Sequence, residues 1–536
     1  SQHIIDVPVN KSVYNGASGK QFSISNNRAR ANLVPIGNEP TLKVIPLGGL
    51  GEVGKNMMAI EYGQDIIVVD MGVHFPGESY PGINYMIPDI SYLEANKGRI
   101  RGHVFTHGHL DHIAAVKHLL HRVPAPVYGS RFTLGLLERQ MSEAVDKYRP
   151  TYNVLDPDKH ERVKLGVFGI ELVRVNHSIP DSCAIAIDTP VGTIVHSGDW
   201  RFETDPVDGK LTDKDTLKRL GDKGVLLFMS DSTRCEEPGH HSFGEKDIEK
   251  TFEDIMKREP GRMIVSAFSS QIHRIQSVIN AAVNTNRHVA FNGYSMISNV
   301  EVAIRLGNLK VPKGVIMRME EMVRQPDQKV VIICTGSQGE VNAVLARMAS
   351  GDHKFIKVKN TDVIVFSSNP IPGNERAVMR TIDGLMREGP HVYEHRTRAI
   401  DDCGPLHLGG HAFRDEQLEM LKLIRPKYFV PIHGEFHMLV RHAELAVKQF
   451  GMPQDRAIVM DNGDVLELTA NGARKASRVQ AGAIMVDNAG SEVSQVVLKD
   501  RLLMSSEGIF VVVLTIDKRT RQLLTSPDII SRGFIY

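Results

Sequence analysis

The chain has 536 residues and a formal net charge of +1 at neutral pH. This length exceeds one ordinary hydrophobic core, so we expect two or three domains, and the balanced charge excludes a global electrostatic attraction to nucleic acid. The four cysteines form no C-x-x-C pair, and no leader or membrane-length apolar run is visible, which predicts a reduced, cytoplasmic protein without a membrane partner.

Residues 1–40 are polar and aperiodic, so we expect a flexible N-terminal extension there. From residue 41 to about 215, short apolar segments alternate with glycine-rich turns, which predicts a β-rich sandwich with helices on its outside. Helices are expected over 113–120 and 132–145, and the expected strands are Leu42–Leu47, Met57–Glu61, Ile66–Asp70, Ile100–Phe105, Val127–Tyr128, Ile170–Val175, Cys183–Asp188 and Thr193–His196.

From about residue 216 the pattern changes to short apolar strands that are each followed by a helical stretch, as in the βαβ units of a parallel sheet. We therefore expect a parallel α/β domain over 216–395, in which the capping-box pattern Ser242–Glu245 begins one helix. Its expected strands are Val225–Met229, Arg262–Ala267, His288–Phe291, Lys329–Cys334 and Asp362–Phe366.

Near residue 395 the β-rich pattern returns, so we expect 396–465 to complete the sandwich, with the strand Tyr428–Pro431 ending in a histidine-bearing loop. Residues 466–536 are expected to form a linker and the start of a C-terminal region, with strands over 508–516 and 522–524. The apolar end of the chain leads us to expect a further domain beyond residue 536.

Four metal-seeking side chains lie within six positions between the strand Ile100–Phe105 and the following helix. His107, His109, Asp111 and His112 form the pattern H-x-H-x-D-H, at the carboxyl end of a strand, where open α/β sheets tend to bind ligands. Imidazole and carboxylate without thiolate suit zinc or a similar divalent ion, and the spacing can serve two ions. Surface histidines on a turn are the alternative, which is disfavoured because clustered buried imidazoles need a partner.

Two metal ions need more ligands than this motif supplies. His177 and Asp199 each follow a predicted strand, and each alone is more often structural. Together with the motif, and in this order, they resemble the metallo-β-lactamase fold, whose last histidine is matched by His433. Asp70 then matches that fold's first motif, a carboxylate that orients a ligand, although by itself it is also typical of a plain turn.

The long gap between Asp199 and His433 indicates an inserted domain, and a metallo-β-lactamase sandwich with such an insertion resembles the β-CASP nucleases. We therefore predict the α/β class, an αββα sandwich with an inserted parallel α/β domain. The resemblance narrows to bacterial ribonuclease J, from about residue 41 to 536, on the following segments: Leu47–Gly54, Ser230–Thr233, Ile272–Gln276, Thr335–Glu340, Ile371–Glu375, His407–His411, Pro431–Glu435 and Pro527–Gly533.

The resemblance implies two zinc ions, with Mn²⁺ or Mg²⁺ as substitutes. One would be held by His107, His109, His177 and Asp199, and the other by Asp111, His112, Asp199 and His433. Such a pair activates a water molecule and clamps a phosphate for in-line attack. The resemblance also implies that His411 is the general acid for the departing 3′ oxygen, with Asp231 orienting it and favouring its protonated form.

A phosphate pocket is expected at His407, Leu408, Gly409, Gly410 and His411, because glycines let backbone N–H groups approach an anion. Further contacts are expected where strands of the parallel sheet lead into helices, a position suited to anion binding; these residues are Ser269, Ser270, His273, Arg274 and Ser337. Plain turns are the alternative for each loop. The loop 335–339 lacks the lysine of a P-loop, which counts against nucleotide hydrolysis.

The sequence departs from the ribonuclease J pattern at a few positions. Arg234 and Cys235 stand where the family often has Asn-Ala, and Gly409 and Phe413 stand where serines are common. Leu110 replaces a frequent acidic residue that is not a ligand. These departures leave the metal ligands intact and place the hydrogen bonding of the phosphate pocket in question.

By resemblance, we expect a cytoplasmic zinc-dependent ribonuclease that degrades single-stranded RNA 5′ to 3′ from a monophosphorylated end, with some endonucleolytic cleavage, in mRNA decay and rRNA processing. A homodimer or homotetramer is implied, with an RNA helicase or the ribosome as partner. The alternatives are a catalytically weak RNA-binding scaffold, a DNA-directed β-CASP nuclease and a small-molecule hydrolase on the same sandwich.

Overall fold

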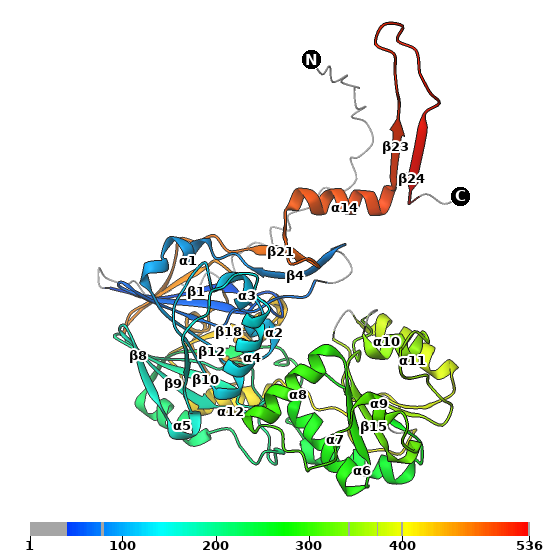
Figure 1. The fold of residues 1–536 in the computed structure, drawn as a ribbon. Helices are drawn as coiled ribbons and strands as arrows, with labels where there is room; N and C mark the ends of the chain where they lie inside the picture. The colour runs from blue at the N-terminus through cyan, green and yellow to red at the C-terminus, as the bar shows by residue number, and fades with distance from the viewer. Residues whose placement is uncertain (1–39, 77–79, 341–342, 372–373, 398–399, 534–536) are drawn as a thin grey trace.

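The computed structural model describes residues 40–76, 80–340, 343–371, 374–397 and 400–533, so the extension predicted over 1–40 lies almost entirely outside the described residues. Two sheets stack to form one lobe, and a third, parallel sheet with its helices forms a second lobe beside it (Figure 1). The lobe of two stacked sheets is called the sandwich below, and the second lobe is called the inserted lobe.

The two sheets of the sandwich are mixed. The first has the order β20-β19-β1-β2-β3-β5-β6-β7, with strands β1 (Leu42–Gly48), β2 (Met57–Tyr62), β3 (Asp65–Val69), β5 (Ile100–Val104), β6 (Val127–Gly129), β7 (Tyr152–Val154), β19 (Val465–Leu468) and β20 (Ala473–Ala476). The second has the order β18-β12-β11-β10-β9-β8, with strands β8 (Arg162–Leu165), β9 (Phe168–Arg174), β10 (Cys183–Thr189), β11 (Gly192–His196), β12 (Val225–Asp231) and β18 (Tyr428–Ile432).

The alternation of apolar side chains explains the layers. In β1, Leu42 and Val44 belong to the cluster between the sheets, whereas Ile45 and Leu47 belong to the cluster on the opposite face, because successive side chains of a strand point to opposite faces. That opposite face is covered by α1 (Ser91–Ala95), α2 (Leu110–Ile113), α3 (Val116–Leu119) and α4 (Arg131–Ser142). The second sheet is covered by α5 (Lys214–Lys223), α12 (Arg414–Ile424) and α13 (Phe436–Lys448). The predicted αββα sandwich is confirmed.

The sheet of the inserted lobe is parallel throughout, in the order β14-β15-β13-β16-β17. Its strands are β13 (Met263–Ser266), β14 (His288–Asn292), β15 (Val330–Cys334), β16 (Val363–Phe366) and β17 (His391–Tyr393). Its helices are α6 (Glu245–Arg258), α7 (Ile272–Asn284), α8 (Tyr294–Leu306), α9 (Met319–Met322), α10 (Val344–Ala349) and α11 (Glu375–Arg387). Helix α8 packs on α4 of the sandwich, so the two lobes share a continuous apolar cluster (Figure 1).

Several predicted boundaries are wrong. The strand expected at Val225–Met229 in the inserted lobe is β12 of the second sandwich sheet, parallel to β11 and β18. An apolar strand beside a helix has the same pattern in either sheet, so the sequence did not separate them. The sandwich also continues past 465, because β19 and β20 extend the first sheet. Helix α6 is capped at Gly244, whose N–H donates to Asp247, and not at Ser242.

The C-terminal part differs from the expected linker. Strand β21 (Ala483–Asp487) pairs with β4 (Ile83–Pro88) and β22 (Glu492–Val493), and α14 (Gln495–Glu507) leads to the hairpin of β23 (Ile509–Val513) and β24 (Asp528–Arg532). The second expected strand, 522–524, lies near the tip of this hairpin, where Leu523 forms an isolated bridge with Ile516, and the regular strand of that arm is β24. The hairpin extends away from both lobes (Figure 1). None of the helices in the described part of the chain combines the length and apolar character that a membrane span requires.

Candidate metal centre and active site

The loops that carry the predicted ligands all follow strands of the sandwich. Strand β5 leads into the loop 107–112, β9 into His177, β11 into Asp199 and β18 into His433. Within each sheet the relevant neighbours are parallel, β3 with β5 and β11 with β12 and β18. Their carboxyl ends therefore lie at one edge of the sandwich, and the predicted side chains meet there.

Asp70 fixes the shape of the first ligand loop. Its φ of 59° is left-handed, and its carboxylate accepts hydrogen bonds from the Thr106 backbone N–H and hydroxyl, both at 2.8 Å. The same carboxylate lies 2.7 Å from His112 Nδ1. A bond through Nδ1 directs Nε2 of His112 toward the other ligands, which supports the predicted orienting role of Asp70.

Three histidines form a first donor group. His109 Nδ1 lies 3.2 Å from His107 Nε2 and 3.0 Å from His177 Nε2. His177 Nδ1 lies 2.7 Å from the carbonyl oxygen of Gly410, and because a carbonyl only accepts, Nδ1 carries the proton and Nε2 keeps its lone pair. Nε2 of His107, Nδ1 of His109 and Nε2 of His177 thus surround one common point, where they could bind a metal ion.

A second donor group consists of Asp111, His112, Asp199 and His433, and its ligand atoms all lie within 4.8 Å of one another. Oδ2 of Asp199 is 3.2 Å from His112 Nε2 and 3.4 Å from His433 Nε2. The same oxygen is 3.7 Å from His107 Nε2 and 3.9 Å from His177 Nε2. One carboxylate oxygen therefore lies between the two groups, where a bridging ligand belongs.

The protonation of the three histidines of the first donor group and of Asp199 suits divalent cations. Burial lowers the pKa of His107 and His177 well below the ordinary value and that of His109 to about 4, so these imidazoles are neutral. Burial would raise the pKa of Asp199, but His433 and His112 hold it well below its ordinary value. Its Oδ1 is buried and has no hydrogen-bond partner among the described residues, which is costly unless a cation is present. The donor set fits zinc or a related ion.

His411 and Asp231 form a hydrogen-bonded pair beside the two donor groups. His411 Nδ1 lies 2.7 Å from Asp231 Oδ2, and the His411 ring is stacked on that of His433 with centroids 5.5 Å apart. Burial opposes the charged imidazole, but the Asp231 carboxylate outweighs it and raises the pKa of His411 to about 9. Because Asp231 occupies Nδ1, the proton on Nε2 is the one available to a ligand.

Comparison with known proteins agrees with this geometry. The family model "Ribonuclease J, beta-CASP domain" matches residues 260–385, and the model "Metallo-beta-lactamase superfamily" matches residues 50–236. Ribonuclease J of Synechocystis sp. is 38% identical over 92% of this chain and 76% of its own length. Ribonuclease J 1 of Streptococcus pyogenes is 39% identical over 92% of this chain and 86% of its own length. The chain belongs to the ribonuclease J family.

Two further models match the remaining parts of this ribonuclease J chain. "Zn-dependent metallo-hydrolase RNA specificity domain" matches residues 405–459 and "Ribonuclease J C-terminal domain" matches residues 496–536. A solved protein of unknown function from Enterococcus faecalis V583 shares the fold, with a TM-score of 0.54 and 14% identity over 80% of this chain and all of its own. The predicted family, the metallo-β-lactamase and β-CASP fold and the metal-dependent ribonuclease class are confirmed.

Asn56 is a site residue that the sequence reasoning missed. It is buried, its Oδ1 lies 2.9 Å from His433 Nδ1, and its Nδ2 lies 3.0 Å from His112 Nε2. The amide oxygen therefore orients His433 with Nε2 toward Asp199. No local pattern marks this asparagine, because its importance comes from a residue that follows it by 377 positions.

A buried chain of hydrogen bonds supports Asp231 from behind, and it was also missed. Trp200 Nε1 donates to Ser230 Oγ, Ser230 Oγ donates to Gln417 Oε1, and Gln417 Nε2 donates to the carbonyl of Asp231. Trp200 directly follows Asp199. The two halves of the site are thus connected through neutral polar groups, and the only sequence signal is a single aromatic residue after the turn Ser197–Asp199.

The predicted phosphate loop, residues 407–411, lies against the two donor groups, but its residues differ in exposure. Gly409 and Gly410 are partly exposed, and neither backbone N–H makes a hydrogen bond within the described residues. Leu408 is 1% exposed and belongs to the apolar cluster, so its side chain packs inward and does not contact a substrate. His407 Nδ1 is 3.3 Å from the Ser367 carbonyl, and burial lowers the pKa of His407 to about 3.

The residues predicted in the inserted lobe are mostly occupied by protein contacts. Arg274 is fully buried, with two bonds of 2.9 Å to Glu245 and one of 3.0 Å to the Leu406 carbonyl. The prediction that Arg274 binds substrate is therefore wrong, since its guanidinium joins the inserted lobe to the phosphate loop. His273 Nε2 lies 3.3 Å from Asp208 Oδ2, and Ser337 is buried. Ser269 and Ser270 alone are partly exposed.

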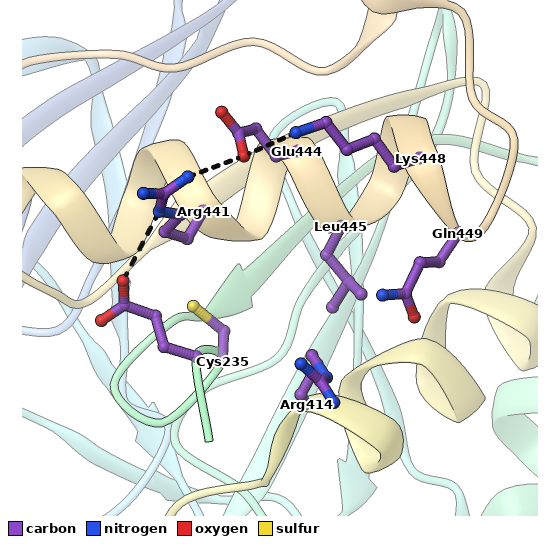
Figure 2. Close-up of a pocket in the computed structure, with 8 residues that line it drawn as sticks. Cys235, Arg414, Arg441, Glu444, Leu445, Lys448 and Gln449 are labelled. Carbon is purple, nitrogen blue, oxygen red and sulfur yellow. Dashed lines mark hydrogen bonds and ion pairs between the residues drawn. The ribbon is translucent and has the colours of Figure 1, made fainter. Parts of the chain in front are cut away.

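A cavity of about 310 Å³ lies next to the site, lined by Cys235, Arg414 and residues of α13. It contains none of the predicted ligands. Figure 2 shows Arg441 and Lys448 paired with Glu444, each at 3.0 Å, whereas Arg414 has no partner among the side chains drawn and forms an ion pair with Asp415 at 3.6 Å. Because each of these charges has a partner, we assign the cavity no role in the reaction.

Proposed function

We propose that this member of the ribonuclease J family is a zinc-dependent enzyme that hydrolyses single-stranded RNA 5′ to 3′, prefers a 5′-monophosphate end and also cleaves internally. The observation that carries the proposal is the Asp199 oxygen that lies between two groups of metal-seeking atoms. The family models for the two lobes support it, as does the model described as an RNA specificity domain.

The ligand sets follow the two donor groups. His107, His109, His177 and Asp199 would hold one zinc ion, and Asp111, His112, Asp199 and His433 the other, with Mn²⁺ or Mg²⁺ as substitutes. When bound, such a pair lowers the pKa of a water molecule and neutralises charge on the phosphate. Asp70 and Asn56 keep the imidazoles in the tautomers that this binding requires.

The proton for the departing 3′ oxygen is held on Nε2 of His411. Asp231 favours this protonated form, and it orients the ring through the bond to Nδ1. Thr233 donates from its backbone N–H and its hydroxyl to Asp231 Oδ1, at 2.9 and 2.7 Å, so the carboxylate is fixed in place. The unpaired N–H groups of Gly409 and Gly410 support binding of an RNA phosphate beside His411.

In the cell, we propose that the enzyme acts in mRNA decay and rRNA processing in the cytoplasm. A homodimer or homotetramer, and an RNA helicase or the ribosome as partner, belong to the same proposal and rest on the family. These partners would place structured RNA within reach of a site that accepts single strands.

The direct test uses the purified chain with zinc or manganese and a labelled single-stranded RNA in four matched forms: 5′-monophosphate, 5′-triphosphate, 5′-hydroxyl and the equivalent DNA. We expect stepwise cleavage of the monophosphate form, slower cleavage of the triphosphate form and none of the DNA. The variant His109→Ala removes the residue shared by both short contacts of the first donor group and should abolish cleavage.

The matched control is His121→Ala, a surface histidine that is 41% exposed and pairs with Asp146. It changes the same residue type nearby and should leave cleavage unaltered. The proposal fails if the wild-type chain leaves every RNA intact while holding stoichiometric metal, or if His109→Ala cleaves as fast as His121→Ala. Faster cleavage of DNA than of RNA would contradict the substrate assignment.

A further inference from the structure

Three positions at which the sequence departs from the family pattern are in contact with one another. The guanidinium carbon of Arg234 lies 3.9 Å from the centre of the Phe413 ring. Nη1 of Arg234 lies 2.6 Å from the place that a Cβ at Gly409 would occupy. Gly409 has no left-handed φ, so a larger residue there would have to displace the guanidinium of Arg234 but would meet no backbone strain.

The guanidinium of Arg234 is held in one orientation. Its Nε donates to Glu237 Oε1 at 2.9 Å and its Nη2 donates to Glu237 Oε2, which forms a two-point fork. The Phe413 ring supports its face through a cation–π contact. Nη1 makes no hydrogen bond in the described part of the chain. The side chain is 26% exposed, so a ligand can reach this nitrogen. Arg234 therefore presents one free, pre-oriented donor edge.

This donor edge borders the reaction centre. Gly409 lies two residues before His411, and its carbonyl accepts a bond of 3.1 Å from the buried Arg201. The next carbonyl, that of Gly410, contacts the predicted zinc ligand His177. On its other side, Arg234 directly follows Thr233, which is bonded to Asp231. The free edge of Arg234 is thus fixed relative to both the general acid and the metal groups.

We propose that Nη1 of Arg234 binds a phosphate group of the RNA, next to the unpaired N–H groups of Gly409 and Gly410, and that Glu237 and Phe413 are positioning residues for it. This inference rests on the proposed function and adds a substrate contact to it. A guanidinium edge suits the oxygens of either a 5′-terminal phosphate or an internal phosphodiester. The guanidinium occupies the space that a side chain at residue 409 would take.

The first test compares the metal-loaded wild type with Arg234→Gln on 5′-monophosphate and 5′-hydroxyl RNA. Loss of a charge-assisted bond should raise KM about 10- to 100-fold, with kcat within about threefold and zinc content unchanged. A terminal phosphate contact raises KM only for the monophosphate RNA, and an internal contact raises it for both. Arg234→Lys keeps the charge without the fork and should have an intermediate KM. The matched control Arg474→Gln removes an exposed arginine that is also paired with a glutamate and should change neither constant.

The second test is a double-mutant cycle with Gly409→Ala. Alone, the added Cβ displaces the guanidinium and should raise KM nearly as much as Arg234→Gln does. In the Arg234→Gln background the guanidinium is absent, so the added Cβ has no close neighbour and should not raise KM further. An equal effect of Gly409→Ala in both backgrounds would overturn the inference, and so would an unchanged KM of Arg234→Gln for both RNAs.

A binding measurement separates this inference from the proposed function. Inorganic phosphate is titrated calorimetrically into the metal-loaded wild type and into Arg234→Gln, and we expect at least about 10-fold weaker binding by the variant. Equal phosphate affinity in the two proteins overturns the inference whether or not RNA is cleaved. A wild type that binds phosphate through Arg234 but cleaves no RNA would instead contradict the proposed function.

Discussion

The ligand loops of the sandwich and the strand-to-helix loops of the inserted lobe carry the same kinds of polar residues, but they use them differently. In the loop 107–112 the nitrogens and carboxylate oxygens face one another and leave Asp199 Oδ1 without a partner. At the start of helix α7, just after the loop 269–271, the guanidinium of Arg274 is already bonded to Glu245 and Leu406. The difference teaches that a polar residue at the end of a strand indicates a ligand site only when its polar atoms remain unmatched.

The largest effect should come from the residue that both donor groups share. Asp199→Ala removes the oxygen between the two groups, so we expect loss of both metal ions and a fall in kcat of at least about 10⁴-fold. Elemental analysis and single-turnover cleavage measure the two effects together. Retention of one full equivalent of tightly bound zinc would show that the two groups do not depend on Asp199.

A large effect on stability, but not on RNA contact, should come from Arg274. Burial raises the pKa of Glu245, but Arg274 outweighs it and lowers that pKa below the ordinary value, so Arg274→Met leaves a buried, unpaired carboxylate. We expect a loss of about 3–5 kcal/mol in the free energy of unfolding, measured by denaturant titration. The double variant with Glu245→Gln should regain part of this loss. If the free energy of unfolding stayed unchanged while KM rose, Arg274 would be a substrate-binding residue, and the contrast between the two kinds of loop would not hold.

Asp231, which orients the proposed general acid His411, should show an intermediate effect. Asp231→Asn keeps a hydrogen-bonding group beside His411 Nδ1 but removes the charge that favours the protonated ring, so we expect kcat to fall about 10²- to 10³-fold. Metal content should stay unchanged, and RNA binding should stay within about threefold. Simultaneous loss of zinc would show instead that Asp231 belongs to the metal site, as its proximity to Asp199 and His433 also allows.

The smallest of these effects is expected from the carboxylate behind the ligands. Asp70→Asn weakens the orientation of His112 and of the Thr106 loop, and we expect metal affinity to fall about 10- to 100-fold. Competition with a zinc chelator measures it. Cleavage at saturating zinc should recover, whereas an irrecoverable loss would indicate that Asp70 takes part in the reaction itself.

The structure brings the predicted ligands together at one edge of the sandwich. The motif 107–112 could be recognised from the residues themselves, whereas the ligand set with His177, Asp199 and His433 and the stacked sheets came from the resemblance to the metallo-β-lactamase fold. By contrast, Asn56 contacts His433 across 377 positions, and no local pattern records such a pairing. The strand Val225–Asp231 was misassigned for the same reason, since only its partners β11 and β18 decide which sheet it joins.

The central claim, two ions held around Asp199 for RNA hydrolysis, is tested most directly by titrating zinc into the metal-free chain while cleavage of a 5′-monophosphate RNA is followed. The account predicts that cleavage rises only as the second equivalent of zinc binds and that the titration ends at two equivalents per chain. Full cleavage with a single equivalent, or no cleavage after two are bound, would contradict it.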